Sequence, residues 1–305
     1  MLLLTNHLYK VVTMQWIFLA FITLICSFSA YSACVNPQKA QEIATISNSK
    51  LTENSGMDFS RIHKNVFWTL NDANNTSEIF AISTAGENLG AYEIEGVKNV
   101  DWEDIAVAPC IDDSSANCIF IADIGNNKGK RNEFYIHVVE EPLKLNDRSL
   151  TVKETITFHK NGGFNFESFS INERTKEFYL ISKAGKKDEI KNTSFVFGLT
   201  EGASELKTLA TISFDDFPEE LSKEDMTVTS GDFHTPSQTL LIGTYGKAYE
   251  ISLKDIKSFN SKARTIEIPQ MEQAEAITYQ STPEGLSILT SSEGTDQPLY
   301  KISCQ

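Results

Sequence analysis

Acidic side chains crowd the start of a segment that otherwise resembles a buried strand. The segment contains Asp101, Trp102, Glu103 and Asp104, and an apolar run at 105–107 follows directly. Carboxylates beside a core cost free energy unless a proton, a cation or several hydrogen bonds accompany them. The segment is therefore either a solvated strand end or part of a site for a positively charged species.

Polar residues recur at corresponding places in five stretches of the chain. The five positions, 45 to 64 residues apart, are Ser55, Glu103, Glu167, Ser230 and Glu275. If five strands line a common channel, the three glutamates meet near one axis, where like charges need a proton or a cation. Calcium accepts six to eight oxygen ligands, and these positions lack the His and Cys that zinc and copper prefer. The pattern predicts a Ca²⁺ site, with a plain water-filled channel as the alternative. At the fourth position, Thr229 or Asp232 takes the place of Ser230 if the alignment shifts slightly.

Short β-strands must position these residues. The chain alternates β-rich runs with turn residues, shows little helical periodicity, and repeats one strand plan five times. Four units offer a fourth strand, the fifth lacks one, and a spare strand at 41–47 precedes the first unit. We predict an all-β fold, a β-propeller of five four-stranded blades in a single domain at 34–305, closed by the N-terminal strand. Typical blade length gives six blades as the alternative.

The cysteines agree with a closed ring. Cys110 and Cys118 flank a polar, turn-like stretch, which favours a local disulfide. Cys34 and Cys304 lie at the two ends of the proposed domain, and a bridge between them requires those ends to meet. Free buried thiols are the alternative.

The first 33 residues have the order of a secretory signal. Lys10 precedes an apolar run at 14–28, and small residues follow up to Ala33. The run is short for a membrane span, so we expect an exported protein, periplasmic or secreted, with a lipid anchor at Cys34 as the less favoured alternative. The excess of 41 acidic over 27 basic residues argues against nucleic-acid binding, and we expect a monomer.

A second group of polar residues ends the second strand of each unit. Because this strand is antiparallel to the first, its end lies beside the start of the first strand. These residues are Asp72, Asp123, Lys183, Tyr245 and Ser292, and the loops after them add Asn74, Asn75, Asn126, Asn127, Arg131, Lys186, Lys187, Lys247 and Glu293. An acidic centre rimmed by amides and cations suits an oxygen-rich or phosphorylated ligand, whereas the alternative is ordinary turn composition.

The ring of polar residues resembles that of the soluble calcium-activated nucleotidases, or calcium-dependent apyrases. Their five-bladed propellers hold a central calcium with a Ser, Glu, Glu, Ser, Glu series, which is similar here to "ENSGM", "WEDIAV", "FESFSI", "VTSGDF" and "AEAITY". "FWTLNDANN" resembles the family's paired acids near the nucleotide, with Asn71 in place of one acid and Asp72 as the other. The motifs "DWEDIA", "ADIGNN" and "SSEG" are closer to exported bacterial propellers of unassigned activity. The resemblance implies fold and metal more than nucleotide hydrolysis.

Two functions compete. In the first, the protein is a calcium-dependent hydrolase of a phosphoanhydride, phosphoester or lactone, with Asp72 or Asp123 as general base. Arg131 and Lys183 would then stabilise developing negative charge. In the second, calcium is structural and the mouth of the channel is a non-catalytic binding module for a glycan, peptide or protein.

Overall fold

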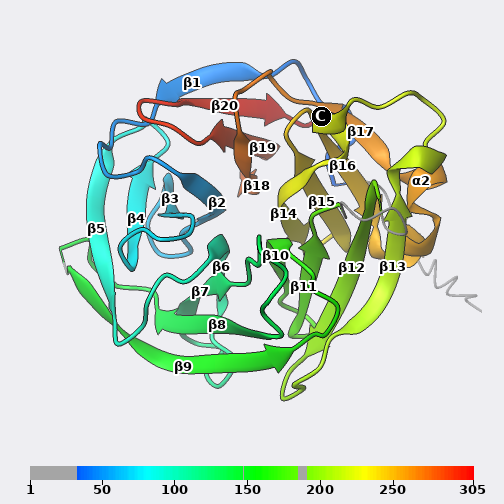
Figure 1. Ribbon diagram of the computed structural model, residues 1–305. Coiled ribbons are helices and arrows are strands. Elements are labelled where there is room, and N and C mark those ends of the chain that lie inside the picture. The colour runs from blue at the N-terminus through cyan, green and yellow to red at the C-terminus, as the bar shows by residue number, and fades with distance from the viewer. Residues whose placement is uncertain (1–32, 147, 185–190) are drawn as a thin grey trace, which may run out of the picture.

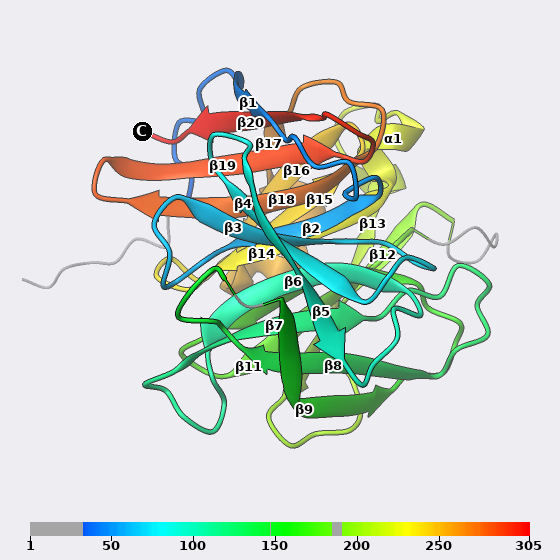
Figure 2. The same ribbon diagram turned by 90° about the vertical axis from the view of Figure 1, so that its left-hand side faces the viewer.

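The computed structural model describes residues 33–146, 148–184 and 191–305. Its β-sheets stand side by side around a common centre (Figure 1), and Figure 2 shows the same ring from the side. The predicted signal at 1–33 lies outside the described residues except for Ala33, and so do Lys186 and Lys187.

Four sheets make up the fold, and the strands of each sheet are given below in the order in which they pair. The first three are β10 (Phe166–Asn172), β11 (Glu177–Ser182), β12 (Thr193–Thr200) and β13 (Lys207–Ser213); β14 (Val228–His234), β15 (Thr239–Thr244), β16 (Lys247–Ser252) and β17 (Arg264–Glu267); and β18 (Ala274–Thr282), β19 (Gly285–Ser292), β20 (Pro298–Ser303) and β1 (Gln41–Thr45). The fourth has eight strands: β2 (Asn54–Phe59), β3 (Val66–Asn71), β4 (Glu78–Ser83), β5 (Asn88–Glu95), β9 (Ser149–His159), β8 (Glu133–Glu140), β7 (Asn117–Asp123) and β6 (Trp102–Pro109).

The eight-stranded sheet differs from the prediction of separate four-stranded units. Two antiparallel sets, β2–β5 and β6–β9, are joined by a short parallel pairing in which Glu93, Ile94 and Glu95 lie opposite residues 149–151. The cause is the length of β9, which is the longest strand described, with 11 residues. Its first residues therefore run beside the end of β5.

The N-terminal strand completes the last sheet, as predicted. Strand β1 pairs antiparallel with β20, and the Cys34–Cys304 disulfide joins the adjoining segments with a Cα–Cα distance of 4.8 Å. Because the Cys34 sulfur is bonded to Cys304, it is not free to carry a lipid. The second predicted disulfide, Cys110–Cys118, closes the turn between β6 and β7.

The first strand of each four-stranded set lies nearest the centre. Strands β2, β6, β10, β14 and β18 contact one another in this cyclic order, and β18 contacts β2 again. Figure 1 shows these five strands around the middle of the ring. Each hydrophobic cluster takes side chains from two neighbouring sets of strands, such as Trp68 and Tyr92 with Trp102 and Ile121.

The buried strands explain the sequence pattern. Strands β3, β7, β11 and β15 are buried along nearly their whole length, so they read as continuous apolar runs rather than as alternating ones. The helices among the described residues have one or two turns: Phe214–Asp216, α1 (Lys223–Met226), Leu253–Ser258 and α2 (Phe259–Lys262). Within the described ranges, no helix is long and apolar enough to cross a membrane.

Candidate metal centre

The three predicted glutamates occupy equivalent positions. Each of the five innermost strands has an irregular register near its start, and Glu103, Glu167 and Glu275 fall at that irregularity in β6, β10 and β18. Irregularities of this kind re-aim side chains. The charges of the three residues influence one another, since Glu167 raises the pKa of Glu103, and Glu275 raises that of Glu167. The structure therefore gathers them at one end of the innermost strands.

The two predicted serines are one residue away from the equivalent position. Gly56 and Thr229 fall at the irregularity in β2 and β14. Ser55 Oγ instead donates a hydrogen bond of 2.5 Å to the Glu103 carbonyl, and Ser230 Oγ lies against Gly243. Both hydroxyls thus make contacts between strands, and the Ser, Glu, Glu, Ser, Glu ring of metal ligands stays a prediction.

Position 56 requires glycine because Asp104 of the neighbouring strand lies very close to it. Its φ is +68°, and a side chain there would collide with Asp104. Thr229 carries a hydroxyl, but this group donates to the Ala274 carbonyl at 2.6 Å. Neither residue therefore adds a carboxylate to those of the three glutamates.

Glu103 and Glu275 each belong to a group of three neighbouring carboxylates. Asp72, Asp101 and Glu103 each place one ligand oxygen within 4.8 Å of the others, and Asp72, Glu275 and Glu293 do the same. We call these five residues the acidic centre. Asp72 belongs to both groups, and it follows β3, whereas Asp101 precedes β6 and Glu293 follows β19.

Asn99 fixes the two loops that carry Asp72 and Asp101. Its side-chain amide donates to the carbonyls of Asn71 at 2.9 Å and of Asp72 at 2.8 Å. Its oxygen accepts from the N–H of Trp102 at 3.1 Å. The end of β3 is thereby held against the start of β6, so the carboxylates are close because the backbone places them there.

Burial makes the acidic centre costly without a cation. Glu103 is 2% exposed, and its Oε1 has no hydrogen-bond partner among the described residues. Burial and then Glu167, Asp72 and Asp101 raise the pKa of Glu103 well above its usual range. Burial also raises the pKa of Asp101, and that of Asp72 to about 6.

Glu293, in the second group of carboxylates around Asp72, also has a raised pKa. Burial and a hydrogen bond with Glu275 raise the pKa of Glu293 to about 9. Ionised carboxylates this close repel one another, so a bound proton or cation would lower the cost of bringing them together.

Glu167 has a cation of its own. Lys183 Nζ lies 2.8 Å from Glu167 Oε2, and the Asn165 amide donates to the other oxygen. Burial raises the pKa of Glu167 to about 8 against the opposing effect of Lys183. Of the three glutamates, Glu167 is the one that Lys183 pairs with in the described residues, which makes the site asymmetric.

Tyr245 stands beside this lysine. Its hydroxyl donates to Glu275 at 2.5 Å, and Lys183 Nζ lies 5.7 Å from the centroid of its ring. A cleft of about 910 Å³ adjoins both residues. Its charged walls consist of Lys183, Lys191, Lys223, Glu224 and Glu272.

Asp123 and Arg131 pair with each other beside the acidic centre, where burial raises the pKa of Asp101, Arg131 lowers it and Asp123 raises it. Arg131 donates to the Asp123 carboxylate at 2.7 Å and to the Gly125 carbonyl at 2.9 Å. Asp123 is buried, and its other oxygen lies 3.9 Å from His137 Nε2. The pair therefore fastens the loop after β7.

A one-residue offset separates Asp123 from the residues that reach the acidic centre in other units. Asp123 pairs with the residue just before the irregularity in β6, as Ser292 does in β18. Lys183, Tyr245 and Glu293 come one position later than this in their own units. Successive side chains of a strand point to opposite faces, so Glu293 rather than Ser292 reaches the acidic centre.

The sequence matches no protein-family model and no curated protein sequence. Among solved structures, the chain is similar to the major allergen Mala s 1 of Malassezia sympodialis, with a TM-score of 0.54 and 11% identity over 85% of this chain and 95% of that one. The fold is a β-propeller. A weaker similarity links it to the Escherichia coli aldose sugar dehydrogenase, with a TM-score of 0.44, 12% identity, and coverage of 88% and 100%. For the exo-β-1,3-galactanase 1,3Gal43A of Clostridium thermocellum the values are 0.49, 10%, 86% and 62%. At these identities the propeller similarity concerns the fold alone.

Proposed function

We propose that this propeller is an exported, calcium-dependent hydrolase of small anionic phosphoesters or phosphoanhydrides. The observation that carries the proposal is the unpartnered, buried oxygen of Glu103, which faces a group of carboxylates. The two disulfides are compatible with an exported protein.

The residues of the acidic centre fit a hard divalent cation. Asp72, Asp101 and Glu103 would hold it, since their ligand oxygens lie within 4.8 Å of one another and all donors are carboxylate oxygens, which calcium prefers. A bound calcium ion would supply Lewis-acid polarisation of a substrate oxygen and a place for water. Asn99 would keep Asp72 and Asp101 in place while substrate enters.

We also infer that the ring has five blades of four strands. Five innermost strands contact one another in a cycle, and each has its irregular register near the same end. On this interpretation the eight-stranded sheet counts as two blades joined by the β5–β9 pairing.

The neighbouring cleft supports an anionic substrate. Lys191 and Lys223 lie in its walls together with Lys183, so a phosphate bound there would meet ammonium groups beside a cation held by the acidic centre. This favours phosphoryl substrates over neutral lactones. Asp123 is paired with Arg131 and Asp72 would hold the cation, so neither residue is left as a separate general base.

A non-catalytic binding module is the second candidate. It is favoured by the pairing of Asp123 with Arg131, which removes two of the four residues that the sequence offered for catalysis. In this case calcium would bridge the blades and the lysine-lined cleft would hold a phosphorylated ligand without turnover.

Metal analysis combined with a substrate panel tests both candidates. The purified protein is equilibrated with Ca²⁺, its metal content is measured, and nucleotides, sugar phosphates and lactones are tested with and without chelator. We expect about one Ca²⁺ per chain and phosphate release that chelator abolishes, and Glu103→Gln should lose both, whereas the exposed-residue control Glu220→Gln should lose neither. Calcium binding without turnover would favour the binding module, and turnover that persists in chelator would refute the hydrolase.

A further inference from the structure

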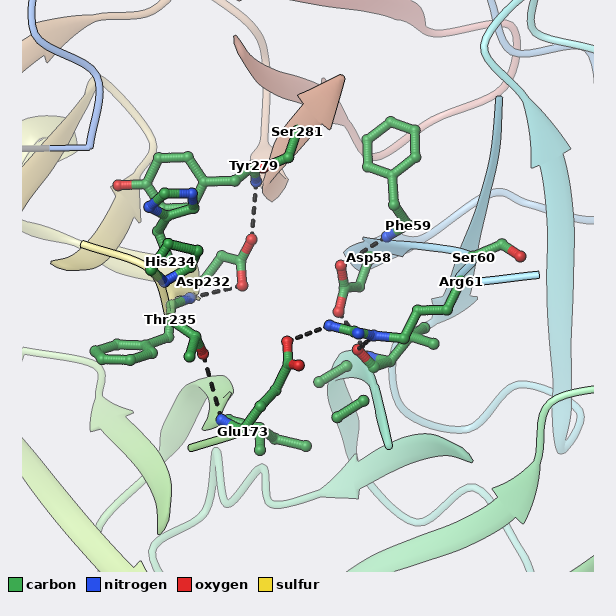
Figure 3. Close-up of a pocket in the computed structure, with 16 residues that line it drawn as sticks. Asp58, Phe59, Ser60, Arg61, Glu173, Asp232, His234, Thr235, Tyr279 and Ser281 are labelled. Atoms are coloured by element: carbon green, nitrogen blue, oxygen red, sulfur yellow. Dashed lines mark hydrogen bonds and ion pairs between the residues drawn. The ribbon is translucent and has the colours of Figure 1, made fainter. Parts of the chain in front are cut away.

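A second cavity lies at the opposite ends of the innermost strands. It has a volume of about 400 Å³ and is lined by residues at or near the ends of β2, β6, β10, β14 and β18 and in turns that follow these strands. The acidic centre is at the starts of these strands, so the two sites are separate. Figure 3 shows the cavity with its lining side chains.

Three carboxylates point into the middle of this cavity. They belong to Asp58, Asp232 and Glu173, which come from three different sets of strands and approach from different sides (Figure 3). One guanidinium, that of Arg61, extends between them and forms an ion pair with Glu173. In formal charge, three acids thus face one base.

Backbone N–H groups hold the two aspartates firmly. Asp58 accepts from Phe59 and Val107, each at 2.6 Å. Asp232 accepts from Phe233 at 2.6 Å and from Tyr279 at 2.8 Å. Each aspartate therefore bridges to the next innermost strand, and its orientation is set before any ligand arrives.

These contacts leave acceptor capacity in the cavity. A carboxylate offers about four lone-pair directions. The single hydroxyl hydrogen of Thr278 can donate to one aspartate at a time, either to Asp232 at 3.0 Å or to Asp58 at 3.4 Å. Asp58 and Asp232 therefore each retain room for a hydrogen bond from a ligand. Three carboxylates and one guanidinium line the cavity, so a ligand with charged N–H groups fits it best.

One wall of the cavity is aromatic and uncharged. The rings of His234 and Tyr279 lie 5.4 Å apart, and Figure 3 shows them together beside Asp232. Tyr279 is held in place by its hydroxyl, which donates to Glu250 at 2.5 Å. Burial lowers the pKa of His234, so this wall presents ring surface rather than a competing positive charge.

We propose that this cavity binds a small organic cation, a primary ammonium on a short carbon chain. The ammonium would lie between Asp58, Asp232 and Glu173, and its carbon chain would pack on the rings of Tyr279 and His234. Such a cation relieves the repulsion between the carboxylates and supplies the missing donors. The alternative is that both aspartates only fasten neighbouring strands and the cavity holds water.

Calorimetric titration of the purified protein in Ca²⁺ with putrescine, agmatine, choline and glucosamine tests the proposal. Glucose and 1,4-butanediol are the neutral controls. We expect at least one of the primary amines to bind in a 1:1 ratio and neither neutral compound to bind. Binding of none of the amines, or equal binding of amines and neutral compounds, would overturn the proposal.

Two variants with opposite effects locate the site. Glu173→Gln should weaken amine binding about tenfold, since a charged hydrogen bond contributes about 1.5 kcal/mol or more. Arg61→Met should strengthen it, because the competing cation is removed while the side chain keeps much of its length. Glu220→Gln, at an exposed position outside both sites, should leave amine binding unchanged. If both cavity variants bind as the parent does, or both only weaken binding together with a fall in melting temperature, the assignment to this cavity is wrong.

Discussion

The substitution Glu103→Gln distinguishes two effects of the acidic centre: the loss of stability caused by repulsion between its carboxylates, and the gain of stability when it binds Ca²⁺. In the absence of a divalent cation, Glu103 is a buried carboxyl group with an unpartnered oxygen beside Asp72 and Asp101. Two unit charges 4.8 Å apart repel by about 3.5 kcal/mol at an effective dielectric constant of about 20. Bound protons remove much of this repulsion, so we expect the neutral amide to raise the free energy of unfolding by about 1–2 kcal/mol in chelator.

Calcium should reverse the order of stability. The parent protein gains about 2.7 kcal/mol when free Ca²⁺ is about one hundred times its dissociation constant, whereas the variant lacks one of three charged ligands and gains little. For a chain of this size, about 2–4 °C of melting temperature corresponds to 1 kcal/mol. The variant should therefore melt a few degrees above the parent in chelator and a few degrees below it in Ca²⁺.

Thermal unfolding followed by circular dichroism, in chelator and in millimolar Ca²⁺, measures both values. Glu220→Gln provides the matched control, because Glu220 is exposed and its substitution should change neither value. If Glu103→Gln is less stable than the parent in chelator, or if Ca²⁺ leaves the parent's melting temperature unchanged, the reasoning about the acidic centre is wrong.

Three further predictions concern the same scaffold. Lys183→Met leaves buried Glu167 without its cation, so urea unfolding should show a loss of about 3 kcal/mol, and an unchanged value would contradict the pairing. Replacing the Cys34 disulfide by serines should destabilise more than replacing the Cys110 disulfide, about 5 against about 2.5 kcal/mol by chain entropy, because the loops span 270 and 8 residues; equal melting temperatures would refute this. Burial raises the pKa of Asp104 well above 3.8. The contribution of Asp104 to the free energy of unfolding is therefore present at low pH and declines as pH rises through the pKa of the folded state. Asp104→Asn should flatten the fall in the free energy of unfolding measured from pH 5 to pH 8.

Repetition made the fold predictable from the sequence. The strand plan recurs five times, and strand count and cysteine positions both required the chain ends to meet, as β1 and the Cys34–Cys304 disulfide confirm. The β5–β9 pairing could not be predicted, because it depends on where the long strand β9 begins relative to the neighbouring set.

The candidate site was predictable only where carboxylates mark the repeat. The glutamates are distinctive, so all three align correctly, whereas "NSG" and "VTSG" offer several small polar residues and the alignment shifted by one. A shift of one residue turns a side chain to the other face, which moved the prediction from Gly56 and Thr229 to the adjacent serines. Asp101 was recognised as a loop residue beside the strand, but its approach to Asp72 depends on the contacts of Asn99, which lie between two repeats.

In each four-stranded set, the residue that follows the strand next to the innermost one determines whether the nearby glutamate has a partner for its negative charge. After β11 this residue is Lys183, which pairs with Glu167, and after β15 it is Tyr245, which donates to Glu275. After β19 it is Glu293, which adds a further acid. A propeller with equivalent glutamates at three innermost strands can therefore place its cation off the axis, because the charges of these flanking residues differ from blade to blade. Exchange of Lys183 for an acid would extend the acidic centre towards Glu167, so the position of one lysine limits how far a cation site can spread around the ring.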